Sequence, residues 1–300
     1  MMLIAGTIPI KDLPLVTGRV KSDGDNLVIA GYRIPCAQGT GAMISAALAT
    51  TDYLKLTSPQ VVVAGDIGEG VGSRQIYQYL IQNVARLSPR VLALHYCLPD
   101  MALMRRLCQA VGECHPRPLL IADAGSMYAA KAAGLAGEFA AFTPDAAELA
   151  FLADTEAIHP AYINRHLFCT DITRPPRLIV AAYCQRSAAR LLLVKGATDY
   201  IAREGDILAT VAEPDVPDLE AIGGTGDTIA GLLSAFVACG LELHEAAIIA
   251  ARVNRTAGKL ARVTVASGVK QVISQFPAVF KEYLCRWSGV CSIKGGSYHE

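Results

Sequence analysis

A glycine-rich turn, GGTG at residues 223–226, runs directly into Asp227 and then into an apolar segment that continues to about residue 240. Glycines in such a turn present backbone N–H groups, and the helix that follows adds partial positive charge at its N-terminus. Glycine also permits the close approach of an anion. The pattern predicts an anion hole made by Gly223, Gly224, Thr225 and Gly226, with Asp227 in the first helical turn beside the anion.

A carboxylate in that position has a chemical use. It can take a proton from a hydroxyl that attacks a phosphoryl group, while the amides stabilise the charge that develops. The residues alone leave a second interpretation open, in which Asp227 lies in an ordinary helix N-terminus and the glycines serve packing.

A second pair of carboxylates occurs in TPDAAE, residues 143–148, where Asp145 and Glu148 are three residues apart. If a helix begins after Pro144, the two side chains share one face. Together they are candidates for a Mg²⁺ site, because Mg²⁺ prefers a few carboxylates together with waters and phosphates. The alternative is an acidic helix N-terminus that complements the helix dipole.

Two charged residues end apolar runs. Asp123 ends LLIAD, and the carboxyl ends of strands in open α/β sheets face the ligand crevice, so we expect Asp123 to orient substrate. Its alternative role is to cap the next helix. Lys195 ends LLLVK and is expected to reach phosphate or substrate, with solvated surface as the alternative. The loop GDIGEG at 65–70 also follows an apolar run, which is a weak signal for crevice lining.

Short apolar runs alternate with helical patterns along the chain, which predicts a mainly parallel sheet with helices on both faces. From 190 to 211 the pattern changes to an antiparallel hairpin section with Glu204–Gly205 as turn material. Expected strands cover 26–34, 60–65, 90–96, 118–123, 139–143, 177–183, 190–196, 199–203 and 206–211. Expected helices cover about 40–54, 72–87, 99–113, 125–135, 144–153, 225–240, 242–263 and 267–284.

Composition bounds the function. The 300 residues are 52 % hydrophobic with a formal net charge of zero, which gives no electrostatic footprint for nucleic acid or an anionic membrane. Nine cysteines without C-x-x-C spacing favour free thiols in a reducing compartment, and the N-terminus lacks a signal-peptide pattern, so we expect a cytoplasmic protein. The six histidines show no metal-ligand spacing and are assigned no catalytic role.

The segment GGTGDTIAGLLSAFVACG closely resembles the C-terminal signature of the ribokinase-like superfamily, and within it the NAD(P)H-hydrate dehydratase branch. LLIADAGSMYAA followed by FAAFTPDAAELAFL is similar to that branch's D-A-D-A-L-N and T-P-H-x-G-E blocks, and LLLVKGATDYIA to its L-K-G-x-x-T-x-I segment. More weakly, GTGAMISAALA at 39–49 resembles the early glycine-rich turn that lines the superfamily's substrate pocket. The resemblance covers about residues 26–284.

The resemblance implies a three-layer α/β/α ribokinase-like fold that binds ATP or ADP with Mg²⁺. It implies that Asp227 deprotonates or activates a substrate hydroxyl and that the glycine turn holds phosphate. It places Asn254 beside the nucleotide, with internal capping as the alternative, and Gly39 and Gly41 at the substrate. This chain departs from the dehydratase motifs on the substrate side, where Ile121, Ser126, Asp145 and Ala147 replace Asp, Asn, His and Gly.

Three hypotheses follow. The first is a nucleotide-dependent NAD(P)H-hydrate dehydratase; the second is an ATP-dependent kinase of a sugar, vitamin precursor or nucleoside; the third is a non-catalytic nucleotide-binding protein. We expect a small-molecule substrate, no nucleic-acid or membrane partner, and homo-oligomers by analogy with the superfamily. The expected organisation is an N-terminal extension at 1–25, whose role as clasp, lid or dimer arm stays open, a nucleotide-binding domain at 26–284, and a tail at 285–300.

Overall fold

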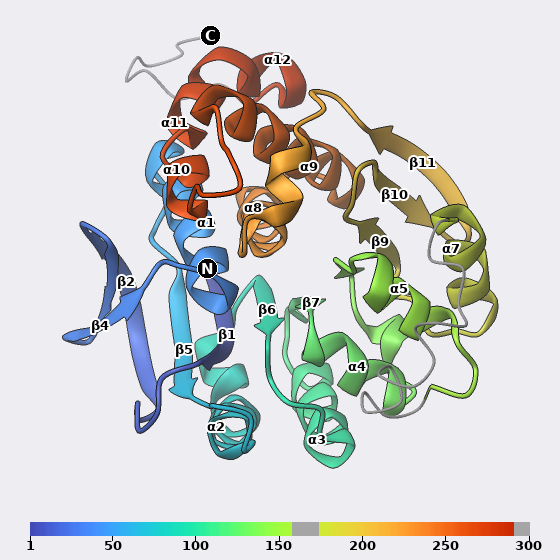
Figure 1. Cartoon of the computed structure of the whole chain (residues 1–300). Coiled ribbons are helices and arrows are strands. Elements are labelled where there is room, and N and C mark those ends of the chain that lie inside the picture. Colours follow the sequence, from blue (N-terminus) through green and yellow to red (C-terminus); the bar gives the residue numbers. More distant parts are fainter. Residues whose placement is uncertain (158–173, 291–300) are drawn as a thin grey trace, which may run out of the picture.

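The computed structural model describes residues 1–157 and 174–290. Eleven strands form one sheet in the order β11-β10-β9-β8-β7-β6-β1-β5-β2-β3-β4, and the six strands from β9 to β5 run parallel (Figure 1). The strands are β1 (Met2–Ile8), β2 (Val16–Asp23), β3 (Asn26–Ile29), β4 (Tyr32–Pro35), β5 (Gln60–Gly65), β6 (Val91–His95), β7 (Leu119–Asp123), β8 (Ala141–Phe142), β9 (Leu191–Val194), β10 (Asp199–Arg203) and β11 (Asp206–Val211).

Helices cover both faces of the sheet (Figure 1). One face carries α1 (Gly39–Tyr53), α8 (Thr225–Cys239), α9 (Leu243–Ala261), α10 (Val269–Ile273), α11 (Phe276–Val279), a π-helix (Phe280–Leu284) and α12 (Cys285–Ser288). The other carries α2 (Val71–Leu87), α3 (Met101–Gly112), α4 (Gly125–Ala132), α5 (Ala146–Ala153) and α7 (Pro175–Cys184). Short 3₁₀ turns lie at Ala136–Glu138 and Pro217–Ala221.

Each face of the sheet has its own apolar core, and neighbouring residues of one strand divide between the two. In β5, Val61 and Val63 join the core under α8, whereas Val62 and Ala64 join the core under α2. This division explains the uninterrupted apolar strands, since burial on both faces leaves no position for a polar side chain. The predicted three-layer α/β/α fold is confirmed, as is the antiparallel section formed by β9, β10 and β11.

The first 25 residues are part of the sheet rather than an extension. Strand β1, Met2–Ile8, is buried along its whole length and pairs with β5 on one side and β6 on the other. Strand β2 continues the sheet beside β5. The interpretation of residues 1–25 as a clasp, lid or arm outside the domain was therefore wrong.

Two other expectations differ from the structure. Residues 177–183, expected as a strand, belong to helix α7, because Pro175–Pro176 opens a helix and Ile179 and Ala182 are buried three residues apart between exposed positions. The run 26–34 is a hairpin of β3 and β4, because Ala30 and Gly31 both have positive φ, as a two-residue hairpin turn requires.

The expected helix at 267–284 is divided into α10, α11 and the π-helix, with Pro277 near the start of α11.

Six cysteines of the described residues are free, but Cys285 is disulfide-bonded, so the expectation of free thiols was wrong there. Among helices of the described ranges, none combines the length and apolar character needed to cross a membrane.

Helices α1 and α8 pack at a close contact that places their N-termini side by side. Gly231 of α8 lies against Met43 of α1, and a Cβ on Gly231 would collide with the Met43 carbonyl oxygen. The contact therefore requires a residue without a side chain. It also sets the distance between the first residue of α1, Gly39, and Asp227 in α8.

We expect Gly231→Ala to lower the free energy of unfolding by about 1–3 kcal/mol, because overpacking forces the two helices apart. Urea unfolding measures the change. Gly112→Ala is the matched control: no atom lies within 4 Å of its Cβ position, so it should gain about 0.5–1 kcal/mol from helix propensity. Equal stability of Gly231→Ala and the parent protein would contradict the close contact.

Candidate functional site

Strands β6 and β7 end in two polar residues that lie next to each other. His95 and Asp123 are the last residues of their strands and are register partners in the parallel pair. Both are almost completely buried. The chain then turns sharply in the same way on both strands, with φ of 53° at Tyr96 and 51° at Ala124. The carboxyl ends of the parallel strands thus present a histidine and a carboxylate to one point.

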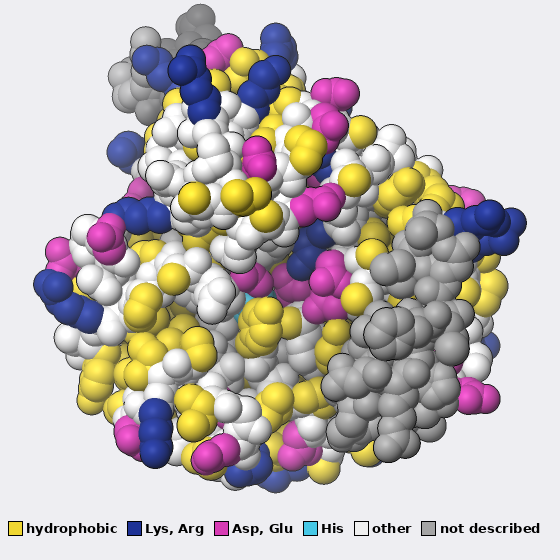
Figure 2. All heavy atoms as spheres, viewed as in Figure 1, with side chains coloured by type: hydrophobic (Ala, Val, Ile, Leu, Met, Phe, Trp, Pro, Cys, Tyr) yellow, Lys and Arg dark blue, Asp and Glu magenta, His cyan; other side chains and the backbone are white. Residues whose placement is uncertain are grey.

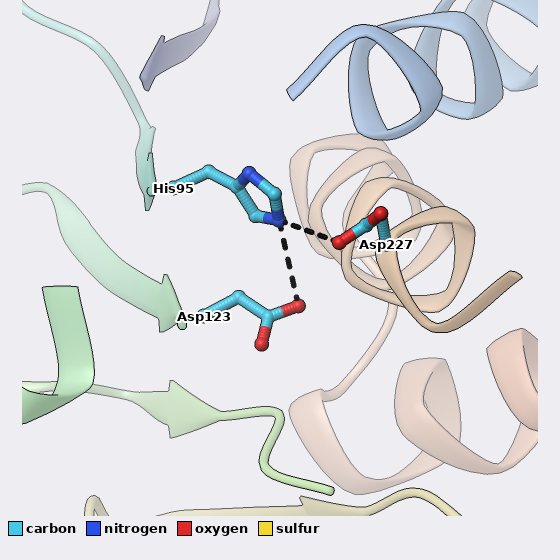
Figure 3. Close-up of side chains that lie close together, drawn as sticks. All are labelled: His95, Asp123 and Asp227. Carbon is cyan, nitrogen blue, oxygen red and sulfur yellow. Dashed lines mark hydrogen bonds and ion pairs between the residues drawn. The ribbon is translucent and has the colours of Figure 1, made fainter. Parts of the chain in front are cut away.

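Asp227 meets these residues from the N-terminus of α8 (Figure 3). Its Oδ1 lies 3.0 Å from Nε2 of His95, and its Oδ2 accepts a 2.7 Å hydrogen bond from the backbone N–H of Gly39. The same His95 nitrogen is 3.8 Å from Asp123 Oδ2. The other ring nitrogen, Nδ1, shares a 3.0 Å hydrogen bond with the Thr40 hydroxyl. Asp227 is therefore joined to α1 and β6 at once.

These contacts set the ionisation of Asp227. Burial alone raises the pKa of its carboxyl, but the hydrogen bond and charge of His95, the charge of Lys195 and the Gly39 N–H together hold that pKa below its usual value. Asp227 is consequently ionised at neutral pH. An ionised carboxylate with fixed orientation is able to accept a proton from a hydroxyl placed beside it.

Lys195 follows β9 and forms an ion pair with Asp123. Its Nζ is 3.0 Å from both carboxylate oxygens of Asp123. Burial lowers the pKa of Lys195, but Asp123, Glu148 and Asp227 raise it well above its usual value, so the ammonium is charged. The side chain also lies against the glycine turn, since a Cβ on Gly226 would be 3.5 Å from Nζ. Lys195 therefore brings positive charge to the N-terminus of α8, as expected for a phosphate contact.

A crevice of about 610 Å³ runs over these residues. Figure 2 shows acidic and basic side chains gathered around a hollow near the centre of this face. The volume falls in the range of small-molecule sites. Of the predicted residues, the crevice is lined by Asp123, Asp145, Glu148, Lys195, Gly224, Thr225, Gly226, Asp227 and Asn254.

The glycine turn has the conformation that the sequence indicated. Gly224 precedes α8 with φ of 97°, a left-handed conformation that favours glycine. The Thr225 hydroxyl donates to the carbonyls of Leu219 and Ile222, at 2.9 and 3.0 Å, so its side chain fixes the turn. Gly223 is exposed and does not line the crevice, although Ile222 and Gly224 on either side of it do.

Asp145 and Glu148 form a capping box at the start of α5. Asp145 Oδ1 accepts from the Glu148 N–H at 2.8 Å, and Glu148 Oε2 accepts from the Asp145 N–H at 2.9 Å. Within the described residues, the second oxygen of each carboxylate makes no hydrogen bond, so each keeps one oxygen for a metal-bound water. Burial raises the pKa of Glu148 to about 8, with Lys195 opposing and Asp123 and Asp145 adding to the rise.

Asn254 and Arg255 lie at the other end of the crevice, on α9. Asn254 is buried, and its Oδ1 accepts a 2.7 Å hydrogen bond from the Thr228 hydroxyl, which leaves its amide hydrogens available to a ligand. Arg255, which the sequence analysis did not identify, pairs with Asp199 at 2.7 Å and donates to the carbonyls of Gly196 and Ala197. It therefore fixes the loop that follows Lys195.

The two glycines expected at the substrate have different positions. Gly39, with φ of 59°, opens α1 and donates its N–H to Asp227. Gly41 is buried two residues further along, where a Cβ would collide with the Pro35 carbonyl, so packing alone requires glycine there.

Leaving the histidines out of the site was wrong for His95. The sequence does contain a signal for His95: the apolar run VLAL ends in this polar residue, just as LLIA ends in Asp123, which was expected at the site. Metal-ligand spacing was the wrong criterion for it, since its partners Asp227 and Thr40 are 132 and 55 residues away.

The family model described as NAD(P)H-hydrate dehydratase matches residues 28–273. The chain belongs to this family. The uncharacterised protein MJ1337 of Methanocaldococcus jannaschii is 36 % identical over 242 residues, which are 81 % of this chain and 100 % of that protein. The family confirms the predicted resemblance. Of the predicted site residues, Gly39, Gly41 and Gly223 are not among those that line the crevice.

Two solved structures share the fold. The ADP/ATP-dependent NAD(P)H-hydrate dehydratase of Bacillus subtilis, co-crystallised with ATP/Mg²⁺ and soaked with CoA, is 14 % identical with a TM-score of 0.55, over 95 % of this chain and 92 % of that one. The pyridoxal kinase of Staphylococcus aureus in complex with AMP-PCP and pyridoxal is 14 % identical with a TM-score of 0.52, over 86 % and 88 %. At these identities the likeness establishes the ribokinase-like fold.

We expect His95→Met to reduce turnover about tenfold to a hundredfold and to move the acid limb of the pH–rate profile to higher pH. His95 lowers the pKa of Asp227, so its removal raises that pKa, and the carboxylate is then protonated at a higher pH. His95→Gln keeps an N–H donor of similar reach and should restore part of both effects. An unchanged acid limb in His95→Met would contradict the coupling between His95 and Asp227.

Proposed function

We propose that the protein is a nucleotide-dependent NAD(P)H-hydrate dehydratase in which Asp227 accepts the proton of the substrate hydroxyl. The observation that carries the proposal is the double anchoring of Asp227, by His95 Nε2 at 3.0 Å and the Gly39 N–H at 2.7 Å, at the N-terminus of α8. Membership of the family supports the reaction class.

The residues present fit a bound nucleotide. The turn at Gly224–Gly226 opens a 15-residue helix, and Lys195 lies against it, so amide dipoles and a charged ammonium meet at one end of the crevice. Asn254 keeps its amide hydrogens for the base or ribose. When bound, ATP or ADP supplies the phosphoryl group that turns the substrate hydroxyl into a leaving group.

Each of the chain's own residues has a separate role in the proposed reaction. Asp227 orients the hydroxyl and takes its proton, and His95 and Gly39 keep the carboxylate ionised and fixed. Lys195 and the α8 amides hold negative charge as it grows on the phosphoryl oxygens. Departure of phosphate from the carbon that bore the hydroxyl, with loss of a proton from its neighbour, leaves the double bond of the reduced nicotinamide. The hydroxyl oxygen of the hydrate leaves in the phosphate, so the net reaction converts the hydrate and ATP into the reduced nicotinamide, ADP and phosphate, or, with ADP as donor, AMP and phosphate.

Asp145 and Glu148 fit a Mg²⁺ ion held through water. The capping box fixes both carboxylates, both residues line the crevice, and each retains an oxygen that makes no hydrogen bond within the described residues. Mg²⁺ usually keeps several waters and takes one or two carboxylates beside phosphates. The ion supplies positive charge to the nucleotide phosphates.

A kinase acting on another hydroxyl compound is the second candidate. It is favoured by the positions of Asp145 and Ala147, which line the crevice and depart from the residues that the dehydratase motif carries there. Transfer of the phosphoryl group to a hydroxyl would use the same Asp227. A phosphorylated product that persists distinguishes the kinase from the dehydratase, which releases phosphate.

We expect Asp227→Asn to lower turnover at least a hundredfold, because the amide cannot accept the proton. The assay follows the return of NADH absorbance from chemically hydrated NADH with Mg²⁺ and either ATP or ADP. Nucleotide binding, measured by calorimetry, should change less than about threefold. Normal turnover in this variant would remove Asp227 from the chemistry, and absence of turnover in the parent protein would favour the kinase.

We expect Glu148→Gln to raise the Mg²⁺ concentration for half-maximal activity about tenfold, because an amide replaces a carboxyl group that the bound ion would ionise against the effect of burial. The glutamine carbonyl still accepts from the Asp145 N–H, so the capping box and the start of α5 are kept. Glu245→Gln, in the first turn of α9, is the matched control that removes an acidic charge outside the crevice lining. An unchanged Mg²⁺ requirement would exclude Glu148 from the metal site.

A further inference from the structure

Tyr96 is an aromatic residue that the fold leaves half exposed inside the crevice. Its exposed fraction is 50 %, and it lines the crevice together with Asp123 and Asp227. Large aromatic side chains elsewhere in the core, such as Tyr77 and Phe142, are fully buried. Tyr96 therefore offers apolar surface to a ligand, directly after the buried His95.

The backbone of Tyr96 has an unusual conformation for such a residue. Its φ is 53°, in the left-handed region that favours glycine and tolerates asparagine. A bulky aromatic side chain there is strained, and strain of this kind persists only where the surrounding structure enforces it, most often at functional sites.

The neighbours of Tyr96 do enforce this turn. The Thr7 hydroxyl donates to the Tyr96 carbonyl at 2.7 Å, and the Leu98 N–H donates to the Ser73 hydroxyl at 2.9 Å. Cys97 between them is buried, and a Cβ on Gly125 would lie 2.6 Å from its carbonyl oxygen. Residues 96–98 are thus held from β1, α2 and the turn after β7.

Asp66, in the GDIGEG loop at residues 65–70, supports the turn at residues 96–98 by fixing Ser73. Its carboxylate accepts from the Ser73 hydroxyl at 2.8 Å and from the backbone N–H groups of Gly68, Gly70 and Ser73. These hydrogen bonds hold the pKa of Asp66 below its usual value against the effect of burial. The loop fixes Ser73, and Ser73 fixes the turn that carries Tyr96.

The ring of Tyr96 lies beside the catalytic carboxylate. It contacts the His95 ring edge to face, with centroids 4.5 Å apart. A Cβ on Gly39 would be 3.8 Å from two carbons of the Tyr96 ring, and Gly39 is the residue whose N–H binds Asp227. Since Gly39 has no side chain, this part of the ring stays open next to Asp227.

The hydroxyl of Tyr96 is a hydrogen-bond donor at any working pH. Burial, and then the charges of Asp227, Asp123 and Glu148, raise its pKa to about 12, with Lys195 opposing. Within the described residues the hydroxyl makes no hydrogen bond. The residue therefore combines an open ring with an available O–H.

From the exposure, the enforced backbone and the position beside Gly39, we infer that Tyr96 recognises substrate by stacking its ring on the flat, conjugated part of a nitrogen heterocycle. The inference rests on the proposed function: the hydrate keeps a flat enamine–carboxamide part in a ring whose other carbons are saturated, and the NADH formed from it has the flatter dihydronicotinamide ring. Aromatic stacking has a preferred offset geometry, so it places the substrate hydroxyl toward Asp227.

Tyr96→Asn tests this inference, because it removes the ring and relieves the strain together. We expect its melting temperature to be unchanged or higher and its KM for hydrated NADH to rise about tenfold, while nucleotide affinity stays the same. Arg262→Asn is the matched control: Arg262 is an exposed residue with φ of 49° at the end of α9, so strain is relieved there with KM unchanged. An unaltered KM in Tyr96→Asn overturns the inference.

A second pair of variants keeps the backbone strain and changes only the side chain. Tyr96→Phe retains a ring and should keep KM within about threefold, whereas Tyr96→Leu should raise it as Tyr96→Asn does. Equal KM values for the leucine and phenylalanine variants would show that apolar area, not a ring, is recognised, and would overturn the proposal.

Binding measured without turnover separates this inference from the proposed function. In the Asp227→Asn background, calorimetry with NADH and with pyridoxal reports whether a flat heterocycle binds and whether Tyr96→Leu weakens it. Binding that depends on Tyr96, with no dehydration by the parent protein, would keep the inference and refute the dehydratase. Failure of both compounds to bind, or equal binding by Tyr96→Leu, would overturn the inference.

Discussion

A carboxylate buried among other carboxylates needs fixed partners, and the positions of the elements around Asp227 meet that requirement. Its two oxygens bind the N-terminus of α1 and the histidine at the end of β6. Both partners depend on tight packing elsewhere: Gly231 lets α1 approach α8, and a Cβ on Gly6 of β1 would collide with the His95 carbonyl. The close contacts at Gly6 and Gly231 therefore position β1, α1 and α8, and the same contacts position Asp227 and its two partners.

The charges of the crevice support the proposed Mg²⁺ ion. Lys195 is paired with both oxygens of Asp123, and His95 is bound to Asp227. Asp227 and Asp123 already pair with the two basic groups, His95 and Lys195, so an incoming phosphate meets no surplus of positive side-chain charge there. The helix dipole of α8 offsets only part of this repulsion. A divalent ion near Asp145 and Glu148 would supply the further positive charge that offsets the rest of the repulsion.

Much of this arrangement could be predicted from local sequence, and the failures have physical causes. Asp123, Lys195 and Asp227 were found because each stands where an apolar run ends or begins, which is a local signal. Strand β1 was missed although all seven residues are buried, because its central place comes from pairing with β5 and β6, far away in the chain. His95 was missed because its partners lie on other elements, and α7 because short apolar runs suit both strand and helix.

The crevice lining contains residues that match the family motif and residues that depart from it. The side formed by the glycine turn of α8 matches the motif residue by residue, and it is the side that a phosphate would contact. Of the four departures from the motif, Asp145 and Ala147 line the crevice, as does Tyr96, whereas Ile121 and Ser126 are buried outside its lining. The backbone around Tyr96 is fixed by the hydrogen bond from the Thr7 hydroxyl to the Tyr96 carbonyl and by that from the Leu98 N–H to Ser73, so the side chain projects from a fixed point. Under the proposed function, a glycine turn that keeps the motif beside altered residues at 145 and 147 means that the altered residues, rather than Asp227, would decide which hydroxyl is presented.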